Sequence, residues 1–163
     1  MKNQILNSIS FEFAKTKKLG LKAIEQIPEV HLSEVLFGET SVAVIVRHLN
    51  GNMKSRWQNF LTEDGEKKWR NRDSEFEISQ TNKKELLTLY IEGWKELEKA
   101  LSELNDEMLT QYVTIRGEKL TVLQALNRQV SHYSYHIGQI VILAKMMLGE
   151  KFNTLSIPKN KSK

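Results

Sequence analysis

The 163-residue chain contains no cysteine, which excludes disulfide bonds, thiolate metal ligands and a cysteine nucleophile. If thiol chemistry takes place on this protein, a substrate must therefore bring the sulfur. Proline occurs only twice, and Pro28 and Pro158 both fall at the edges of regularly patterned segments. Long hydrophobic runs are missing as well, because the richest one, residues 140–148, is interrupted by Lys145 and is too short to span a bilayer.

The distribution of charge does not indicate a nucleic-acid partner, and the lack of an apolar run long enough to span a bilayer means that we expect no membrane partner. The chain has 24 lysines and arginines against 20 acidic residues, a net charge of +4, and the two signs are interspersed over most of its length. The basic residues do not interleave with aromatic ones, as they would on a base-stacking surface. The N-terminus lacks the continuous apolar core of a secretory signal, so we expect a cytoplasmic protein.

Apolar residues recur at helical spacing in four stretches, at about residues 3–27, 41–61, 82–104 and 121–148. The third and fourth stretches open with capping-box patterns, Asn82 with Glu85 and Thr121 with Gln124. The length suits one hydrophobic core. The sequence therefore predicts an all-α fold, a four-helix bundle forming a single domain over residues 1–163 with a loose C-terminal end.

Two segments between the predicted helices differ from ordinary short loops. Residues 62–80 form a long, densely charged connection between helices 2 and 3, and a connection of this length is uncommon unless it packs as a lid or carries function. Residues 112–115 favour a β-strand, and Arg116 and Gly117 supply a turn after them. We therefore expect a small β-hairpin before helix 4.

The histidines carry the strongest chemical signal in the chain. His132 and His136 are four residues apart in the fourth predicted helix, so both rings leave the same face, as in a helix that gives two nitrogen ligands to one metal ion. Burying two neutral imidazoles is costly unless each finds a partner. His48 lies on the second helix and supplies a third imidazole, whereas His31 has no partner at ligand spacing and is expected at the surface.

Three histidine ligands without thiolates suit one divalent metal ion, with zinc favoured and nickel as a further candidate. The chain has no helical Glu-x-x-His motif, which argues against a di-iron carboxylate centre. Three protein ligands leave an open coordination position for water or substrate, as in catalytic zinc sites.

Polar neighbours of these histidines are candidates for supporting the metal ligands or binding substrate. At about 100° per residue, Arg128 and Gln139 lie within roughly 60° of His132 around the helix, with Gln129 at the margin. On the second helix, Asn52 follows His48 by one turn, and Gly51 would let a neighbouring element approach closely.

These motifs resemble the DinB-like (DinB/YfiT) superfamily of small bacterial four-helix bundles. The resemblance is carried by His48 in VIVRHLNGNMKSRW and by the pair in SHYSYHIGQIVILAK. The segments DGEKKWRNRDSEF and LSIPK are similar to one uncharacterised branch of that superfamily, so the likeness covers essentially the whole chain. It implies that His48, His132 and His136 form a metal triad in a cavity between helices.

The resemblance also implies a reaction. Characterised relatives include metal-dependent transferases that attach low-molecular-weight thiols, such as bacillithiol or mycothiol, to electrophiles, so a small thiol and an electrophile are the expected partners. Arg128, Arg70 and Arg72 are then candidates for holding an acidic group of the thiol.

Two alternatives to thiol transfer stay open. The first is hydrolysis by zinc-bound hydroxide, which the lack of a Glu or Asp on the ligand face of the fourth helix disfavours. The second is a non-catalytic metal-binding protein that serves stress-related or other interactions. Apolar positions left over after one core stripe is filled make a homodimer a candidate assembly, whose interface the sequence does not assign.

Overall fold

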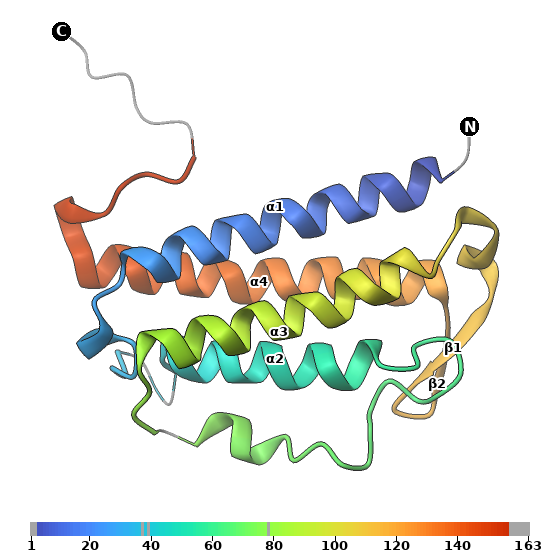
Figure 1. Ribbon diagram of the computed structural model, residues 1–163, viewed down its shortest axis with the longest axis horizontal. Helices are drawn as coiled ribbons and strands as arrows, with labels where there is room; N and C mark the ends of the chain where they lie inside the picture. The colour runs from blue at the N-terminus through green and yellow to red at the C-terminus, as the bar shows by residue number, and fades with distance from the viewer. Residues whose placement is uncertain (1–2, 37, 39, 78, 157–163) are drawn as a thin grey trace, which may run out of the picture.

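Four helices and one short hairpin form the structure (Figure 1), a computed structural model that describes residues 3–36, 38, 40–77 and 79–156. The four-helix bundle and the hairpin before the last helix are confirmed as the sequence predicted them. The predicted loose C-terminal end, residues 157–163, lies outside the described residues. The elements are α1 (Gln4–Gln26), α2 (Val42–Trp57), α3 (Lys83–Ser102), β1 (Tyr112–Ile115), β2 (Glu118–Thr121) and α4 (Val122–Leu148).

The order of the helices explains the long connection between α2 and α3. Figure 1 shows that α2 and α3 run in the same direction, while α1 and α4 run in the opposite one. A chain that leaves the end of α2 must therefore return along the whole helix, about 24 Å for 16 residues, before α3 can begin. Residues 58–82 make this return, and a short 3₁₀ helix within them, Asp73–Phe76, packs against α2.

The helix ends follow local side-chain chemistry. Ser41 and Asn82 accept hydrogen bonds from the backbone N–H groups three residues later, and Thr121 forms a complete capping box with Gln124. The second helix ends at Trp57, four residues earlier than predicted. Asn59 has a φ of 50°, which a continuing helix does not allow, although Phe60 still packs in the core. The expected Asn82 cap is present, with its oxygen bonded to Glu85 N.

Helix α2 is buried around almost its whole circumference, unlike the other three helices. The bundle covers one side of α2 and the return connection covers another. Polar residues along α2 are therefore buried too, and each needs a partner for its donors and acceptors. These buried polar residues are His48, Asn50, Asn52, Ser55 and Arg56.

The hairpin is tied to the first part of the return connection. Its turn places Arg116 and Gly117 at φ values of 55° and 76°, the left-handed pair that a tight two-residue hairpin turn requires. The Asp64 carboxylate accepts hydrogen bonds from the backbone N–H groups of Arg116, Gly117 and Glu66. Burial would raise the pKa of Asp64, but these bonds outweigh it and hold the pKa below its usual value. The connection and the hairpin thus cover the same end of α2.

Within the described part of the chain, the longest and most apolar helices still fall short of what a membrane crossing requires.

Candidate metal centre

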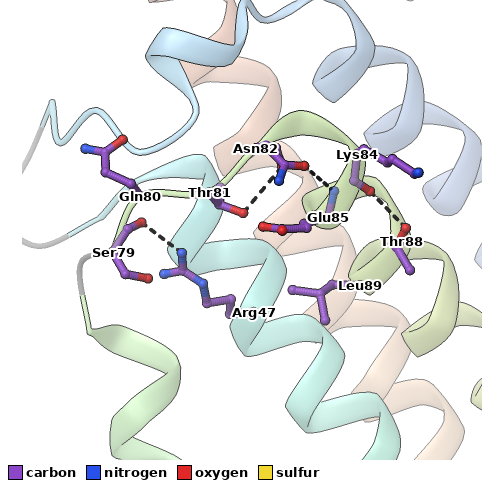
Figure 2. A pocket seen from close by; sticks show the side chains of 9 residues that line it. All are labelled: Arg47, Ser79, Gln80, Thr81, Asn82, Lys84, Glu85, Thr88 and Leu89. Carbon is purple, nitrogen blue, oxygen red and sulfur yellow. Dashed lines mark hydrogen bonds between the residues drawn. The ribbon is translucent and has the colours of Figure 1, made fainter.

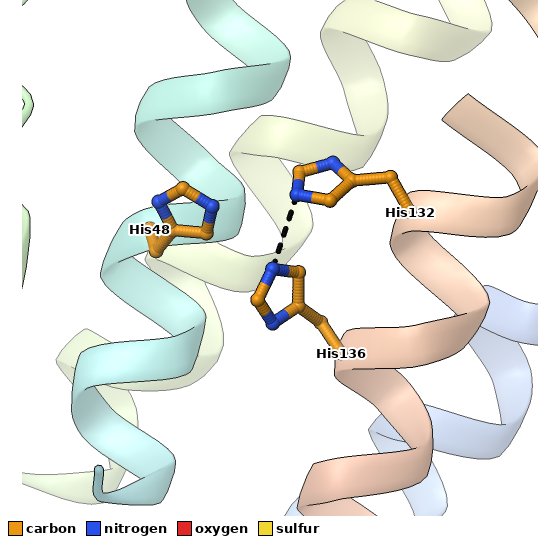
Figure 3. Close-up of side chains that lie close together, drawn as sticks. All are labelled: His48, His132 and His136. Carbon is orange, nitrogen blue, oxygen red and sulfur yellow. Dashed lines mark hydrogen bonds between the residues drawn. The ribbon is translucent and has the colours of Figure 1, made fainter. Parts of the chain in front are cut away.

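Three histidines from two helices face one another inside the bundle. Figure 3 shows His48 on α2 pointing toward His132 and His136 on α4. One ring nitrogen from each histidine lies within 4.8 Å of the others. The Nε2 atoms of His132 and His136 are 3.0 Å apart. His48 is buried, and the other two are partly buried. The structure therefore brings together the three residues that sequence spacing singled out; metal binding by them stays a prediction.

The second nitrogen of each ring has its own acceptor. Nδ1 of His48 lies 2.9 Å from a carboxylate oxygen of Glu75, and Nδ1 of His136 lies 2.8 Å from the side-chain oxygen of Gln139. Nδ1 of His132 lies 3.3 Å from the side-chain oxygen of Gln129. Carboxylate and amide oxygens only accept, so the hydrogen of each ring, in its neutral form, sits on Nδ1. The three Nε2 lone pairs remain available for a ligand.

This arrangement fits a metal ion. With hydrogen on Nδ1 in both rings, the 3.0 Å contact between His132 Nε2 and His136 Nε2 brings two lone pairs together without a hydrogen between them. A cation placed among the nitrogens would turn that repulsion into attraction. Two nitrogens that bind one tetrahedral zinc at 2.0–2.1 Å lie about 3.3 Å apart, close to the separation of this pair.

Both histidines of α4 are neutral at physiological pH. Burial, with the nearby charges of His136 and His48, lowers the pKa of His132 to about 3. Burial lowers the pKa of His136 to about 4, although its hydrogen bond with Gln139 acts in the other direction. Metal ligands must be deprotonated, so these rings are in a ligating state without further cost.

Glu75, which holds His48, is itself held by a buried arginine. Arg70 donates to both Glu75 oxygens, from Nε at 2.7 Å and from Nη2 at 2.8 Å. Burial would raise the pKa of Glu75, but the hydrogen bonds from His48 and Arg70 and the charge of Arg70 hold that pKa below its usual value. Phe76, the next residue, covers the His48 ring at a centroid distance of 5.0 Å. The return connection therefore fixes the orientation of His48.

Gly51 makes the approach of Glu75 possible. A Cβ atom at this position would overlap the Glu75 carboxylate. The close approach expected at Gly51 is thus present, and the approaching element is the short 3₁₀ helix of the return connection. Sequence reasoning did not assign Glu75 to His48; a glycine one turn after the histidine, followed by an acid-rich connection, was the available signal.

The residues predicted to support the histidines fall at different distances from them. Gln129 and Gln139 contact the rings directly, and Gln129, expected at the margin, is 2% exposed. Asn52 is buried and accepts a hydrogen bond from the Tyr133 hydroxyl, which in turn accepts one from Trp57 Nε1. Tyr133 therefore reaches the site through Asn52.

The three arginines that were predicted to bind an acidic group of the substrate have different surroundings. Arg128 is exposed and pairs with Glu118 at 3.1 Å, yet it lines a cavity beside the histidines. Arg70 donates to both oxygens of Glu75, so it is not available to bind an acidic group of a substrate as predicted. Arg72 lies over the Phe76 ring and lines the same cavity as Arg128.

The fourth histidine of the chain lies apart from the other three. His31 is exposed, as expected, and pairs with Glu34 away from the cluster.

A family model described as a protein of unknown function, DUF1572, matches residues 1–161. The chain belongs to the DUF1572 family. Neither the curated proteins nor the solved structures contain a match to it. Because the DUF1572 match covers both histidine-bearing helices and the return connection, the whole site lies within the region that defines the family.

This DUF1572 protein has a larger depression elsewhere, of about 700 Å³, where the return connection meets the starts of α2 and α3 (Figure 2). Several of its polar groups serve local structure. Arg47 donates to the backbone oxygens of Glu77 and Ser79, Asn82 caps α3, and Thr88 donates to the Lys84 backbone oxygen. The described residues that line it include no histidine, so they offer no chemistry comparable to that of the histidine cluster.

Proposed function

We propose that this protein is a divalent-metal-dependent enzyme that transfers a low-molecular-weight thiol to an electrophile. Zinc is the favoured metal and nickel is the second candidate. One observation carries the proposal: three imidazoles have Nδ1 occupied by an acceptor, and their Nε2 atoms face one another beside a cavity. Three protein ligands would leave one position for the substrate. The motif resemblance to the DinB/YfiT superfamily supports the same assignment.

The chain's own residues would orient the metal ligands and exclude other chemistry. Glu75, Gln129 and Gln139 keep the three rings in the tautomer that presents Nε2, which strengthens the rings as donors. When bound, a divalent ion supplies positive charge that lowers the pKa of a thiol and favours the thiolate. The absence of cysteine means that no protein thiol competes with the substrate for the ion.

The proposed reaction forms one sulfur–carbon bond. The thiol loses its proton to solvent, its sulfur attacks the electrophilic carbon, and the bond from that carbon to the leaving group breaks with the electron pair departing on the leaving group. No oxidant or reductant is needed. The substrates are a small thiol and a small electrophile.

Transfer is favoured over hydrolysis because no described residue at the site is a carboxylate free to act as a general base. A zinc hydroxide mechanism calls for a carboxylate or a similar base near the open position. Glu75 is close to His48, but both of its oxygens are occupied by Arg70 and His48. Among the described residues, the cavity beside the histidines is lined by no Asp or Glu.

The test combines metal loading with a survey of thiols. Purified chain is loaded with zinc or nickel, then mixed with monochlorobimane and each of several small thiols, and fluorescent adduct is measured against the uncatalysed rate. We expect metal-dependent adduct formation that His132→Ala abolishes. His31→Ala is the matched control, because His31 is exposed and paired with Glu34 away from the cluster, and it should retain full activity.

The alternatives give different results in the same experiment. Adduct formation equal in wild type and His132→Ala would contradict the transfer proposal. Metal-dependent cleavage of an activated ester without adduct formation would assign the site to hydrolysis. A metal that raises the melting temperature but supports neither reaction would indicate a non-catalytic, metal-binding protein.

A further inference from the structure

Arginines make up half of the residues that line a small cavity beside the histidines. It has a volume of about 200 Å³, and both His48 and His132 open onto it. Its polar wall contains the amides of Asn52 and Gln129. Four arginines complete the lining, and they come from α2, the return connection, the hairpin turn and α4: Arg56, Arg72, Arg116 and Arg128.

Arg56 is the unusual member of this set. Only 3% of its surface is exposed, yet its Nε and Nη1 atoms have no hydrogen-bond partner within the described structure. The nearest carboxylate is Glu66, whose oxygen is 3.9 Å from Nη2 and beyond hydrogen-bond distance. A buried cation with two nitrogens that donate to no partner is costly for the fold. Such a group is expected where a ligand supplies the missing acceptor.

A second buried arginine in the same region shows what a structural arginine looks like here. The Arg70 side chain is just as buried, but its charge is neutralised. It forms a two-point ion pair with Glu75 and a further ion pair with Glu66. Arg56 has no such pair. Arg70 is therefore neutralised by acidic partners, whereas the N–H groups of Arg56 lie beside the cavity without acceptors.

The return connection holds Arg56 in this position. Ser55 donates to the Gly65 backbone oxygen and accepts from Lys67 N, which fixes the loop over α2. A Cβ at Gly65 would lie 2.7 Å from Arg56 Nη1, so the loop backbone passes close to the guanidinium, and a larger residue there would require the Arg56 side chain to shift. The loop therefore shields Arg56 from water without giving it an acceptor.

The other three arginines form a more exposed rim. Arg116 pairs with Glu66 at 3.2 Å and Arg128 with Glu118 at 3.1 Å, and exposed pairs of this kind contribute little stability. Arg72 lies over the Phe76 ring. Asn52 adds a neutral donor: its oxygen accepts from Tyr133, which leaves its amide nitrogen for another partner. The three rim arginines are exposed and can turn toward an anion at little cost.

We infer that the substrate carries an oxyanion, a carboxylate or a phosphate, which binds Arg56 and the rim arginines while the reacting atom sits at the histidine cluster. The inference rests on the proposed function for the position of the reacting atom. Guanidinium groups bind both kinds of oxyanion through two parallel hydrogen bonds, so the shared chemistry is an anion of that geometry. The cavity holds only a small group next to His48 and His132.

The test measures anion binding directly, on the metal-free and the metal-loaded chain. Inorganic phosphate and acetate are titrated at constant ionic strength set with sodium chloride, and the melting temperature is recorded. An anion that binds the folded state raises the melting temperature with concentration. We expect phosphate, acetate or both to stabilise wild type beyond chloride; the more effective anion identifies the oxyanion.

Arg56→Met is the deciding variant, and Arg47→Met is its control on the same helix. Arg47 donates to two backbone oxygens outside the cavity, so its removal should lower the melting temperature and leave the anion effect intact. Arg56→Met removes an uncompensated buried charge, so it should keep or raise the melting temperature while weakening anion binding about tenfold or more. Arg56→Lys keeps the positive charge but loses the guanidinium geometry that forms two parallel hydrogen bonds, so it should weaken anion binding less than Arg56→Met does.

Two results would overturn the inference: no stabilisation of wild type by either anion, or an unchanged anion response in both Arg56 variants. Metal content, measured in parallel, separates this inference from the proposed function. If metal binds but the anions do not, the oxyanion site is wrong and the metal site stands. If the anions bind in an Arg56-dependent way but no metal does, the proposed function is wrong.

Discussion

The two sides of the histidine cluster are held in different ways. On α2, His48 is buried, and its Nδ1 bonds to a carboxylate that a buried arginine grips at two points. On α4, the two rings are partly exposed and bond to neutral glutamines of their own helix, three residues away. The His48 ring is therefore held by a charged carboxylate from a segment far away in the sequence, whereas the α4 rings are held by neutral residues at helical spacing on the same helix.

The difference indicates a division of labour within the site. A carboxylate partner makes an imidazole a stronger donor and holds its orientation, while an amide partner does so more weakly. We therefore expect His48 to be the rigid ligand and the α4 pair to adjust around the metal. The contact of 3.0 Å between the two α4 nitrogens would open slightly in that adjustment.

The largest effect is expected from the ligands themselves. His48→Ala and His136→Ala should each abolish measurable zinc binding, because two nitrogens cannot replace three at one ion. Isothermal titration with zinc measures this loss, and His31→Ala should bind as wild type does. Equal binding by wild type and either ligand variant would remove that histidine from the site.

The next effect comes from the carboxylate that orients His48. Glu75→Gln keeps an acceptor for the ring but removes the charge, so metal affinity should fall about 10- to 100-fold. The variant should also lose about 3 kcal/mol of stability, because Arg70 is left buried with a weaker partner. Glu77→Gln, two residues away and exposed, is the control. Unchanged affinity in Glu75→Gln would show that the charge on Glu75 does not act on the metal.

Two glycines near the histidines provide a matched steric pair. Gly51→Ala places a Cβ against the Glu75 carboxylate, so it should destabilise the fold by about 1–3 kcal/mol and weaken metal binding by displacing Glu75. Gly138→Ala, on α4 beside His136, meets nothing within 4 Å and should stabilise by about 0.5–1 kcal/mol. Thermal melts and zinc titrations of both variants measure the difference; similar behaviour would mean that the α2 side is not tightly packed.

The smallest effect is expected from the amide side. Gln139→Ala removes the acceptor of a partly exposed ring, and water can take its place, so metal affinity should fall by less than about tenfold. Zinc titration measures the change. A loss as large as that of Glu75→Gln would mean that the two sides are held alike.

The α4 side of the site could be predicted from the sequence, whereas on the α2 side only His48 and Asn52 could be predicted and Glu75 could not. His132 and His136 follow from helical spacing, and the caps at Asn82 and Thr121 follow from local patterns. Glu75 did not follow, because it lies 27 residues from His48 in a segment whose path depends on the parallel course of α2 and α3.

Arg56 was also missed, although a local signal for it exists. His48, Asn52 and Arg56 recur every four residues, which places them along one face of the helix. Helical spacing therefore indicates that Arg56 shares the face of His48. That its donors lack partners depends on how the return connection covers it, and spacing does not reveal that.

X-ray absorption at the zinc edge of the zinc-loaded chain tests the central claim most directly. We predict one zinc per chain with three imidazole nitrogens at about 2.0–2.1 Å and one further light atom from water or substrate. In His48→Ala the zinc should be lost. A chain that binds no zinc or nickel, or whose zinc has only oxygen ligands, would contradict the three-histidine centre.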